Sequence, residues 1–357
     1  MPARTSPVTQ GPRPLLGNQD RVGKSATGRT ATATGTGRAG TQAKTIVEGI
    51  NGSIDTTAIQ LRKRLRVGTW NIRSMLQLGK THVLGREMER LRMDICGLVE
   101  VRWGGRGHFI TTEGHMIVYS GEENQGHGGV GVWIHKRNTT AIVGYETVNS
   151  RILVIRVKAK PKCISLIQVY APTSDKEEDE IEEFYQKLEE TLKNVPKRDI
   201  TILMGDFNAK VGDMSIPPVT GKEGLGQINS RGERLIDFCM EQELTLANTW
   251  FKQHPRRLST WTSPGGTTKN QIDYIGIQRK WRTCISNCRT YPGADCDTDH
   301  NLLVASLKIR LGRQKKEEVI KRLNVEELQG YKGLAYEIEV TNRFEVLDVV
   351  AEERSPN

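Results

Sequence analysis

The sequence predicts an α/β fold in which two β-sheets pack against each other and are flanked by helices. From residue 65 onward, short runs of β-type residues alternate with Gly, Asn and Asp turns, and few segments have a helical period. Several of these runs are apolar on both faces, which is typical of central strands in a covered sheet. Many strands with few helices favour two packed sheets with the helices outside.

The expected strands are residues 65–70, 95–100, 116–119, 129–134, 152–157, 164–170, 201–205, 271–277 and 302–307. One helix is expected over residues 81–91. A second spans residues 180–195, where apolar residues step by three or four along one stripe. That stripe consists of Ile181, Phe184, Tyr185, Leu188 and Leu192. A third helix is expected to open at Ser230, with Glu233 completing a capping box.

The chain divides into three parts by composition. Residues 1–62 are rich in Gly, Thr, Ala and Arg, and lack the apolar periodicity needed to offset chain entropy, so we expect disorder there. This basic segment either holds DNA nonspecifically or is only an upstream linker. Residues 65–311 form the expected folded domain. Residues 312–357 are expected to be a charged, partly helical tail.

The net charge of +10 favours polyanionic partners such as nucleic acid or an anionic membrane face. No run approaches the roughly 18 apolar residues of a transmembrane helix. The first residues also lack the apolar core of a secretory signal. We therefore expect an intracellular, nuclear protein with no membrane partner.

The six cysteines are scattered along a long chain, which argues against structural disulfides. Cys284, Cys288, Cys296 and His300 follow a C-x3-C-x7-C-x3-H pattern that would make a zinc site if a loop brought them together. The spacing matches no common zinc finger. We therefore favour buried thiols over a zinc site.

Polar or acidic residues end an apolar run in four places, at residues 69–71, 98–100, 204–208 and 298–300. Strand ends are where rigid scaffolds present functional groups, so these residues can build one site. In the GDFNA segment we expect Gly205 to allow a sharp turn and Asp206 to take a proton from water. Asn208 would then offer an amide on the same side. The alternative for this segment is an Asx-turn.

Glu100 follows five largely apolar residues, where an unpaired carboxylate is costly to bury. A magnesium ion resolves that cost, and it suits one glutamate helped by Asn71 and Asp299. The alternative is a surface pair between Glu100 and Arg102.

His300 adjoins Asp299, and Asp273 lies in another strand-like run. A carboxylate that accepts from a ring N–H favours cationic histidine, which can stabilise negative charge at phosphorus. Tyr170 closes an expected strand, so its hydroxyl could reach the same rim. A structural His–Asp pair and a half-satisfied buried tyrosine are the alternatives.

In this order, the segments TWNIR, GLVEVRW, VYAPT, GDFNA, NQIDYI and TDH resemble the endonuclease/exonuclease/phosphatase superfamily. The longer segments GVGVWIHKR, TGKEGLG, RRLSTWTSPGG and PGADCDTDH are similar to the endonuclease domain of RTE-type non-LTR retrotransposons. The similarity covers about residues 65–311. It implies a four-layer α/β sandwich of the DNase I-like type and AP-endonuclease-like cleavage of one DNA strand through one metal site.

The resemblance also implies which residues would bind a metal ion. Glu100, Asn71 and Asp299 would hold Mg2+, for which Mn2+ could substitute. The implied partner is DNA, and the protein would act as a monomer.

The same resemblance implies the catalytic roles of the residues that match the family's motifs. Asp206 would activate the attacking water, and Asn208 would orient it. His300, steadied by Asp273, would stabilise the phosphorane. Tyr170 would hold the phosphate.

Three positions bear on the resemblance. Arg73 stands where several repair-enzyme relatives have an acidic neighbour of the metal site, and it could contact the DNA backbone instead. Thr298 replaces the usual serine before the Asp–His pair. Trp261 is expected in the core, with stacking on DNA as the alternative. No reverse-transcriptase segment follows within the sequence.

Two rival functions remain open. The first is a phosphatase on a small phosphoester such as an inositol phosphate. The second is a catalytically idle DNA-binding or chromatin-associated host protein.

Overall fold

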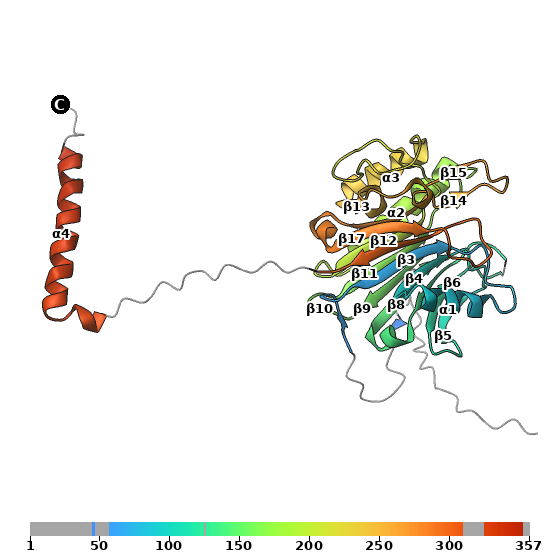
Figure 1. Ribbon diagram of the computed structural model, residues 1–357, viewed down its shortest axis with the longest axis horizontal. Coiled ribbons are helices and arrows are strands. Elements are labelled where there is room, and N and C mark those ends of the chain that lie inside the picture. The colour runs from blue at the N-terminus through green and yellow to red at the C-terminus, as the bar shows by residue number, and fades with distance from the viewer. Residues whose placement is uncertain (1–44, 47–56, 125, 310–324, 353–357) are drawn as a thin grey trace, which may run out of the picture. The chain divides into compact units, whose positions relative to one another are not determined.

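Two seven-stranded mixed sheets pack face to face in the computed structural model (Figure 1), which describes residues 45–46, 57–124, 126–309 and 325–352. The first sheet runs, in spatial order, β1 (Thr45–Ile46), β8 (Ile142–Asn149), β9 (Ile152–Val157), β11 (Ile164–Tyr170), β12 (Ile200–Asp206), β16 (Asp273–Gln278) and β13 (Leu244–Leu246). The second runs β17 (Ile285–Tyr291), β18 (Leu302–Leu307), β3 (Leu65–Asn71), β4 (Ile95–Val99), β7 (Val130–Ile134), β6 (Met116–Ser120) and β5 (Arg106–Ile110). In each sheet one central pair is parallel, β11 with β12 and β3 with β4.

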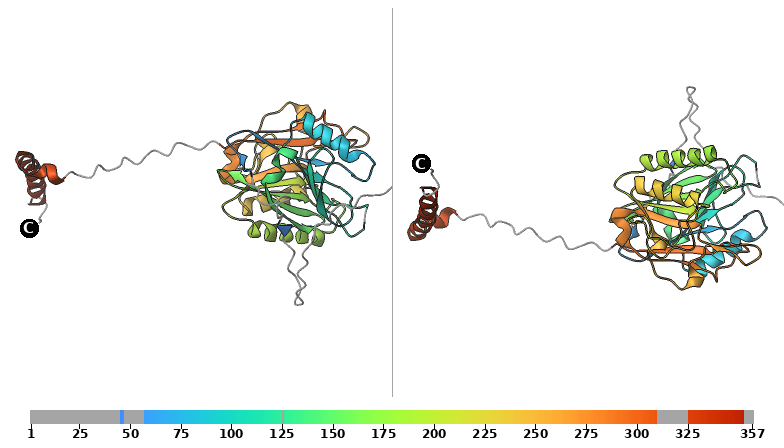
Figure 2. Two further views of the ribbon diagram at one scale, coloured as in Figure 1. Left: turned by 90° about the horizontal axis from the view of Figure 1, so that it is seen from below. Right: turned by 90° about the horizontal axis from the view of Figure 1, so that it is seen from above.

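Helices cover the outer faces of both sheets, which makes four layers (Figure 2). The helix α1 (Lys80–Arg90) packs Leu84 and Met88 against the second sheet, in one apolar cluster with Trp70 and Trp133. The helices α2 (Glu178–Asn194) and α3 (Ser230–Glu241) cover the first sheet. A third apolar cluster fills the space between the sheets. The expected four-layer α/β sandwich is therefore confirmed.

The smaller elements lie at the edges and in the connections. Two short pairs are β2 (Ile59–Gln60) with β10 (Ala159–Lys160), and β14 (Trp261–Thr262) with β15 (Lys269–Asn270). The 3-10 helices are η1 (Lys136–Ala141), η2 (Ala247–Thr249), η3 (Pro255–Arg257), η4 (Arg279–Cys284) and η5 (Val325–Leu328). The helix α4 (Tyr331–Glu352) follows η5.

Each of the nine expected strands is present, and the strands that the sequence pattern missed include β5, β8 and β17. These three lie at or next to a sheet edge, where one neighbour is short or absent. An edge strand exposes more polar residues, as β5 does along most of its length, so its apolar alternation is weak.

The cap of α3 differs from the expected one. Asn229, not Ser230, is the N-cap, and its side-chain oxygen accepts from the backbone N–H of Gly232 at 2.9 Å. The same oxygen accepts from the Lys210 N–H at 2.9 Å. The Asn229 side-chain oxygen therefore bonds both to the helix and to the loop before it, and Ser230 becomes the first helical residue.

The fold begins before the expected boundary at residue 65. The backbone N–H of Ile59 bonds to the Lys158 carbonyl, and Leu61 is fully buried in the cluster between the sheets. The remainder of the expected disordered segment, residues 1–44 and 47–56, lies outside the described residues. The same holds for residues 310–311 of the expected domain and for residues 312–324 and 353–357 of the expected tail.

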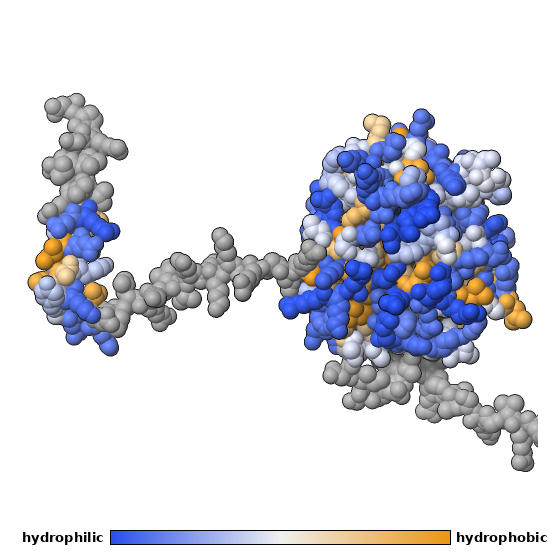
Figure 3. Space-filling view, viewed as in Figure 1, coloured by the Kyte–Doolittle hydropathy of each residue, from blue (hydrophilic) through white to orange (hydrophobic). Residues whose placement is uncertain are grey.

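The visible surface in Figure 3 is mostly hydrophilic, with apolar side chains scattered between polar ones. In the part of the chain that the structure describes, no helix has both the length and the apolar character needed to cross a bilayer.

Candidate active site

One open cleft gathers the side chains that end the central strands. Asn71 ends β3, Tyr170 ends β11 and Asp206 ends β12, while Glu100 directly follows β4. Because β3 is parallel to β4 and β11 to β12, these ends meet at one edge of the sandwich. The cleft has a volume of about 510 Å3. Its lining includes seven of the eight expected site residues: Asn71, Glu100, Tyr170, Asp206, Asn208, Asp299 and His300.

The eighth residue, Asp273, lies beneath His300. It opens β16 and stands directly opposite Asp206 in the antiparallel register. Its backbone N–H donates to the Thr260 hydroxyl at 3.0 Å, and it is 1% exposed. The structure therefore brings all eight expected residues to one place, although they span more than half of the sequence.

Gly205 lies within β12 and allows this strand to pack closely against β11. The sharp turn expected at this residue is therefore wrong. A Cβ on Gly205 would lie 2.0 Å from the Val169 carbonyl oxygen of β11. The turn comes later, at Asn208, whose φ is 48°. The Asn208 N–H donates to the Asp206 Oδ1 at 3.0 Å, which is the Asx-turn alternative. This turn fixes one oxygen of Asp206 and leaves the carboxylate in the cleft.

Asn208 is held by its side chain as well. Its Nδ2 donates to the Ala171 carbonyl at 2.9 Å, just beyond the end of β11. The side chain therefore joins the two parallel strands of the first sheet at the cleft wall.

A buried histidine bridges two carboxylates. His300 Nδ1 donates to the Asp273 Oδ2 at 3.0 Å, and His300 Nε2 lies 3.9 Å from the Asp206 Oδ2. Burial by itself lowers the pKa of His300, but the carboxylates of Asp273, Asp206 and Asp299, with Asp273 first among them, together raise the pKa to about 9. His300 is therefore cationic at neutral pH, with its second ring nitrogen turned toward Asp206.

Asp206 has an unusual affinity for a proton. Burial, followed by the nearby charge of Asp273, raises its pKa to about 7, although His300 and Asn71 act in the opposite direction. A carboxyl group in this range can accept a proton from water near neutral pH.

The Asn71 side chain forms hydrogen bonds to two carboxylates of the site, Glu100 and Asp206. Its Nδ2 donates to the Glu100 Oε1 at 2.9 Å and to the Asp206 Oδ2 at 3.0 Å. Its Oδ1 accepts from the Arg73 N–H at 3.0 Å. The backbone uses one of the two lone pairs of this oxygen, and ligation of a metal by Asn71 stays a prediction. The amide nitrogen fixes the positions of the two carboxylates.

Glu100 has a φ of 56°, a conformation that non-glycine residues seldom adopt without a local reason. Its Oε2 accepts from Arg102 at 2.7 Å, so the expected alternative pair is present. Its Oε1 also accepts from the Tyr170 hydroxyl at 3.3 Å. Burial and the Glu100 charge raise the pKa of Tyr170 far above its usual value, which keeps the hydroxyl as a donor.

Trp261 is neither a core residue nor an isolated surface ring. Its Nε1 donates to the Asp299 Oδ2 at 3.1 Å, and it forms a β-bridge with His300. Arg73, 55% exposed, also approaches the Asp299 Oδ2 at 3.7 Å. The expected core position of Trp261 is therefore wrong, because the half-buried ring lines the cleft and orients Asp299.

The model of the endonuclease/exonuclease/phosphatase family matches residues 68–312, which is most of the chain. The chain belongs to this family. Craniofacial development protein 2 of Tragulus javanicus is 44% identical over 245 residues, which are 69% of this chain and 42% of that protein. The protein of the same name from Bos taurus is also 44% identical, over 41% of its length. The chain spans less than half of these relatives.

Several solved structures share the fold. The endonuclease domain of TRAS1, a telomere-specific non-LTR retrotransposon, superimposes with a TM-score of 0.51 at 17% identity, covering 70% of this chain and all of that domain. The AP endonuclease LMAP from Leishmania major gives 0.54 at 14% identity, covering 75% and 97%. The 3′ phosphatase NExo from Neisseria, bound to a product DNA hairpin, gives 0.53 at 16% identity, covering 69% and 100%. The resemblance found in the sequence is confirmed.

Two sets of side chains in this family member could hold a divalent metal ion. Asp206, Asp273 and His300 each offer a ligand atom, all within 4.8 Å of one another. His300 Nδ1 is bonded to Asp273, so Nε2 is the ring nitrogen that this set would offer. Glu100 and Asp299, which both line the cleft, form the other set. Among the described residues the buried Asp273 Oδ1 and Asp299 Oδ1 both lack a hydrogen-bond partner, so each set holds one acceptor that a cation would satisfy.

Two further residues hold the site together: Lys80, which carries no motif signal, and Thr298, which belongs to the TDH segment. Lys80 is 6% exposed, and its Nζ donates to the carbonyls of Cys296 and Asp297, the latter at 3.3 Å. Thr298 donates through its hydroxyl to the Asn71 carbonyl at 2.8 Å. Together they tie the loop before Asp299 to α1 and β3. A lysine at the start of an amphipathic helix looks solvent-exposed in sequence, so only its burial reveals this role.

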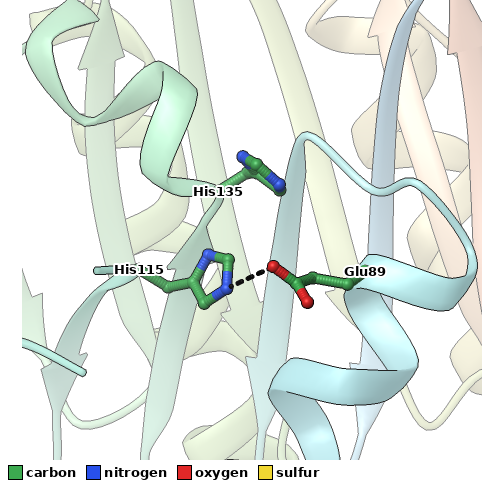
Figure 4. Close-up of side chains that lie close together, drawn as sticks. All are labelled: Glu89, His115 and His135. Atoms are coloured by element: carbon green, nitrogen blue, oxygen red, sulfur yellow. Dashed lines mark ion pairs between the residues drawn. The ribbon is translucent and has the colours of Figure 1, made fainter. Parts of the chain in front are cut away.

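A second histidine–carboxylate group lies beside α1, away from the cleft (Figure 4). His115 Nε2 points at the Glu89 Oε1 from 3.3 Å, and His135 lies next to it. The Nδ1 atoms of His115 and His135 accept the backbone N–H groups of Lys136 and Arg137, each at 3.1 Å. Each Nε2 must therefore carry the proton of the neutral ring, so this group does not suit a metal ion.

The expected buried thiols are found instead of a zinc site. Cys284 and Cys288 lie in the cluster between the sheets, whereas Cys296 lies on the outer face of the second sheet. His300 is bonded to Asp273. Burial raises the pKa of Cys296 to about 12, which disfavours the thiolate that zinc requires.

Proposed function

We propose that this protein is a magnesium-dependent phosphodiester hydrolase that nicks one strand of DNA. The observation that carries the proposal is the Asp206–His300–Asp273 chain at the floor of the cleft, with Glu100 beside it. It combines a carboxylate of raised pKa with a cationic imidazole 3.9 Å away. One group removes a proton while the other stabilises negative charge, and phosphodiester hydrolysis requires both.

Glu100 and Asp299 are the residues that would hold the metal ion. Both are oxygen donors, which magnesium prefers, and Asn71 and Trp261 fix their orientation by hydrogen bonds. When bound, Mg2+ would supply a Lewis acid that polarises the phosphate.

The protein side chains account for the remaining steps. Asp206 accepts the proton of the attacking water, which Asn208 helps to orient from the wall of the cleft. His300 stabilises the charge that develops on the phosphate oxygens, and Asp273 keeps its ring charged and correctly turned. Tyr170 donates its hydroxyl to a phosphate oxygen in place of Glu100.

DNA is the proposed substrate because the rim of the cleft is cationic. Arg73, Arg102 and Lys210 line it, and the whole chain carries a net charge of +10. The relatives of known structure include nucleases and a DNA-bound 3′ phosphatase, which supports the same choice. We further propose that the protein acts as a monomer in the nucleus.

Conversion of supercoiled plasmid to nicked circle by the full chain, with and without Mg2+, tests the proposal. Nicking should require the metal ion and fall by about a thousandfold in Asp206→Asn. Asp213→Asn is the matched control, because Asp213 is exposed and lies outside the cleft lining. Full activity in Asp206→Asn would contradict the site.

The rival functions give different results in the same assay. A folded protein that nicks no plasmid but hydrolyses an inositol phosphate would be a small-phosphoester phosphatase. A folded protein that binds DNA and hydrolyses neither substrate would be the catalytically idle form.

A further inference from the structure

Three arginines converge on one tyrosine at the edge of the second sheet. The Cζ atoms of Arg66, Arg289 and Arg257 lie 5.2, 5.1 and 5.8 Å from the centroid of the Tyr291 ring. Arg66 comes from β3, Arg289 and Tyr291 come from β17, and Arg257 ends η3. Because β18 alone separates β3 from β17, the sheet itself brings these distant segments together.

The positive charge of this group is not balanced by acidic side chains. Among the described residues, no ion pair joins any of the three guanidinium groups to a carboxylate. The Asp94 carboxylate accepts from the backbone N–H of Arg66, but its side-chain ion pair is with Arg137. Three like charges around one ring repel one another, and contact with the ring offsets only part of that repulsion.

Several donors of the group also lack acceptors. Arg66 Nε, Arg66 Nη2 and Arg289 Nε are buried and have no hydrogen-bond partner among the described residues. Arg289 Nη2 donates to the Tyr291 hydroxyl at 3.3 Å. Burial alone would raise the pKa of Tyr291, yet Arg289 and Arg66 hold it below its usual value. A buried donor without an acceptor is costly, so the group is arranged for an anion that would fill this need.

We propose that Arg66, Arg257, Arg289 and the Tyr291 hydroxyl form a binding site for a phosphate group, separate from the cleft. Guanidinium groups match the oxygens of phosphate with paired, charge-assisted hydrogen bonds. None of the four residues lines the cleft. The phosphate belongs either to a nucleic-acid backbone or to a free phosphorylated molecule, and the two sources share this chemistry.

Titration of the full chain with inorganic phosphate at constant ionic strength tests the site. Calorimetry should detect saturable binding in the wild type and binding at least about tenfold weaker in Arg289→Gln and Arg66→Gln. Arg282→Gln is the matched control, because Arg282 lies alone over the Trp250 ring at 4.3 Å and should bind phosphate like the wild type. Binding of phosphate in the cleft would be unchanged in all three variants, so only the binding that is lost on substitution is assigned to the arginine site.

Thermal unfolding in phosphate-free buffer separates a binding role from a packing role. In a site without its anion, Arg289→Gln removes repulsion and should leave the melting temperature unchanged or higher. A lower melting temperature together with wild-type phosphate binding would overturn the proposal, and so would a wild type that binds no phosphate.

DNA binding in the presence of a chelator then identifies the source of the phosphate. If the source is a DNA backbone, Arg289→Gln weakens binding to a long duplex and lowers the salt slope by about one. If DNA binding is unchanged while phosphate binding is lost, the site takes a free phosphorylated molecule. Both outcomes support the site. Both binding measurements can also be made on a protein that has no nicking activity.

Discussion

The Asp206–Asp273–His300 group in the cleft and the Glu89–His115–His135 group beside α1 are built from the same kinds of side chain, but they charge their histidines differently. The pKa of His300 is raised to about 9, whereas burial followed by the charge of Arg137 lowers the pKa of His135 to about 4. All three histidines are nearly buried. Burial alone therefore does not decide the charge of a histidine in this protein.

The partner of each ring nitrogen explains the difference. His300 Nδ1 meets the Asp273 carboxylate, which is 1% exposed and so cannot be screened by water. His115 Nδ1 and His135 Nδ1 meet backbone N–H groups, which can only donate. Glu89 is 43% exposed, so its charge is largely solvated. A buried carboxylate at Nδ1 thus makes a charged histidine, and a backbone donor there makes a neutral one.

Among the changes that compare the two histidine groups, replacement of His300 should have the largest effect. His300→Gln removes the cation that stabilises charge at phosphorus, so nicking should fall by about 10²–10³-fold. His135→Asn, the matched histidine-to-amide change in the other group, should leave nicking unchanged. The rate of plasmid nicking measures both. Equal losses in the two variants would mean that the groups do not differ in function.

Asp273→Asn should make His300 more like the neutral histidines beside α1. Loss of the carboxylate lets the pKa of His300 fall from about 9 toward the ordinary value, so the ring loses its charge at a lower pH. NMR titration of the metal-free protein would follow the ring directly, and nicking at pH 8 should drop by about tenfold. A His300 that titrates as in the wild type would show that Asp273 is not the source of its charge.

Removal of the Lys80 ammonium should affect the cleft group indirectly. Lys80→Met leaves the Cys296 and Asp297 carbonyls without their donor, so the loop that carries Asp299 and His300 becomes less well positioned. We expect several-fold slower nicking with little change in DNA binding, measured as separate kcat and KM effects. Lys193→Met, exposed in the last turn of α2, is the control. A change confined to thermal stability would leave Lys80 with a structural role only.

Acidification should act on the group beside α1. Because the pKa of His135 in the folded protein lies below its unfolded value, its neutral form stabilises the fold above about pH 6.5, and that stability is lost as the pH falls toward about 4. Thermal unfolding of the wild type should show this loss, and His135→Asn should reduce it by about 2–4 °C. An unchanged pH dependence in the variant would assign the loss to other groups.

Strand and helix positions follow from local pattern, which is why β9, β11 and β18 match their expected bounds. Their apolar runs face the buried clusters on both sides, so composition and turn residues suffice to find them. The edge strand β5 has no such signal, because it is mostly exposed. The Asn229 cap was also missed, since the choice between two adjacent capping residues depends on the Lys210 backbone.

Residue chemistry by itself determined that Glu100, Asp206 and His300 belong to the site, because carboxylates and a histidine at strand ends carry a recognisable pattern. Their separation in sequence left their contacts open. Only the tertiary structure decided that His300 Nδ1 meets Asp273, since that contact requires β16 and the loop before β18 to lie together. Protonation depends on distance and burial rather than on order along the chain, so charge state is a property of the fold.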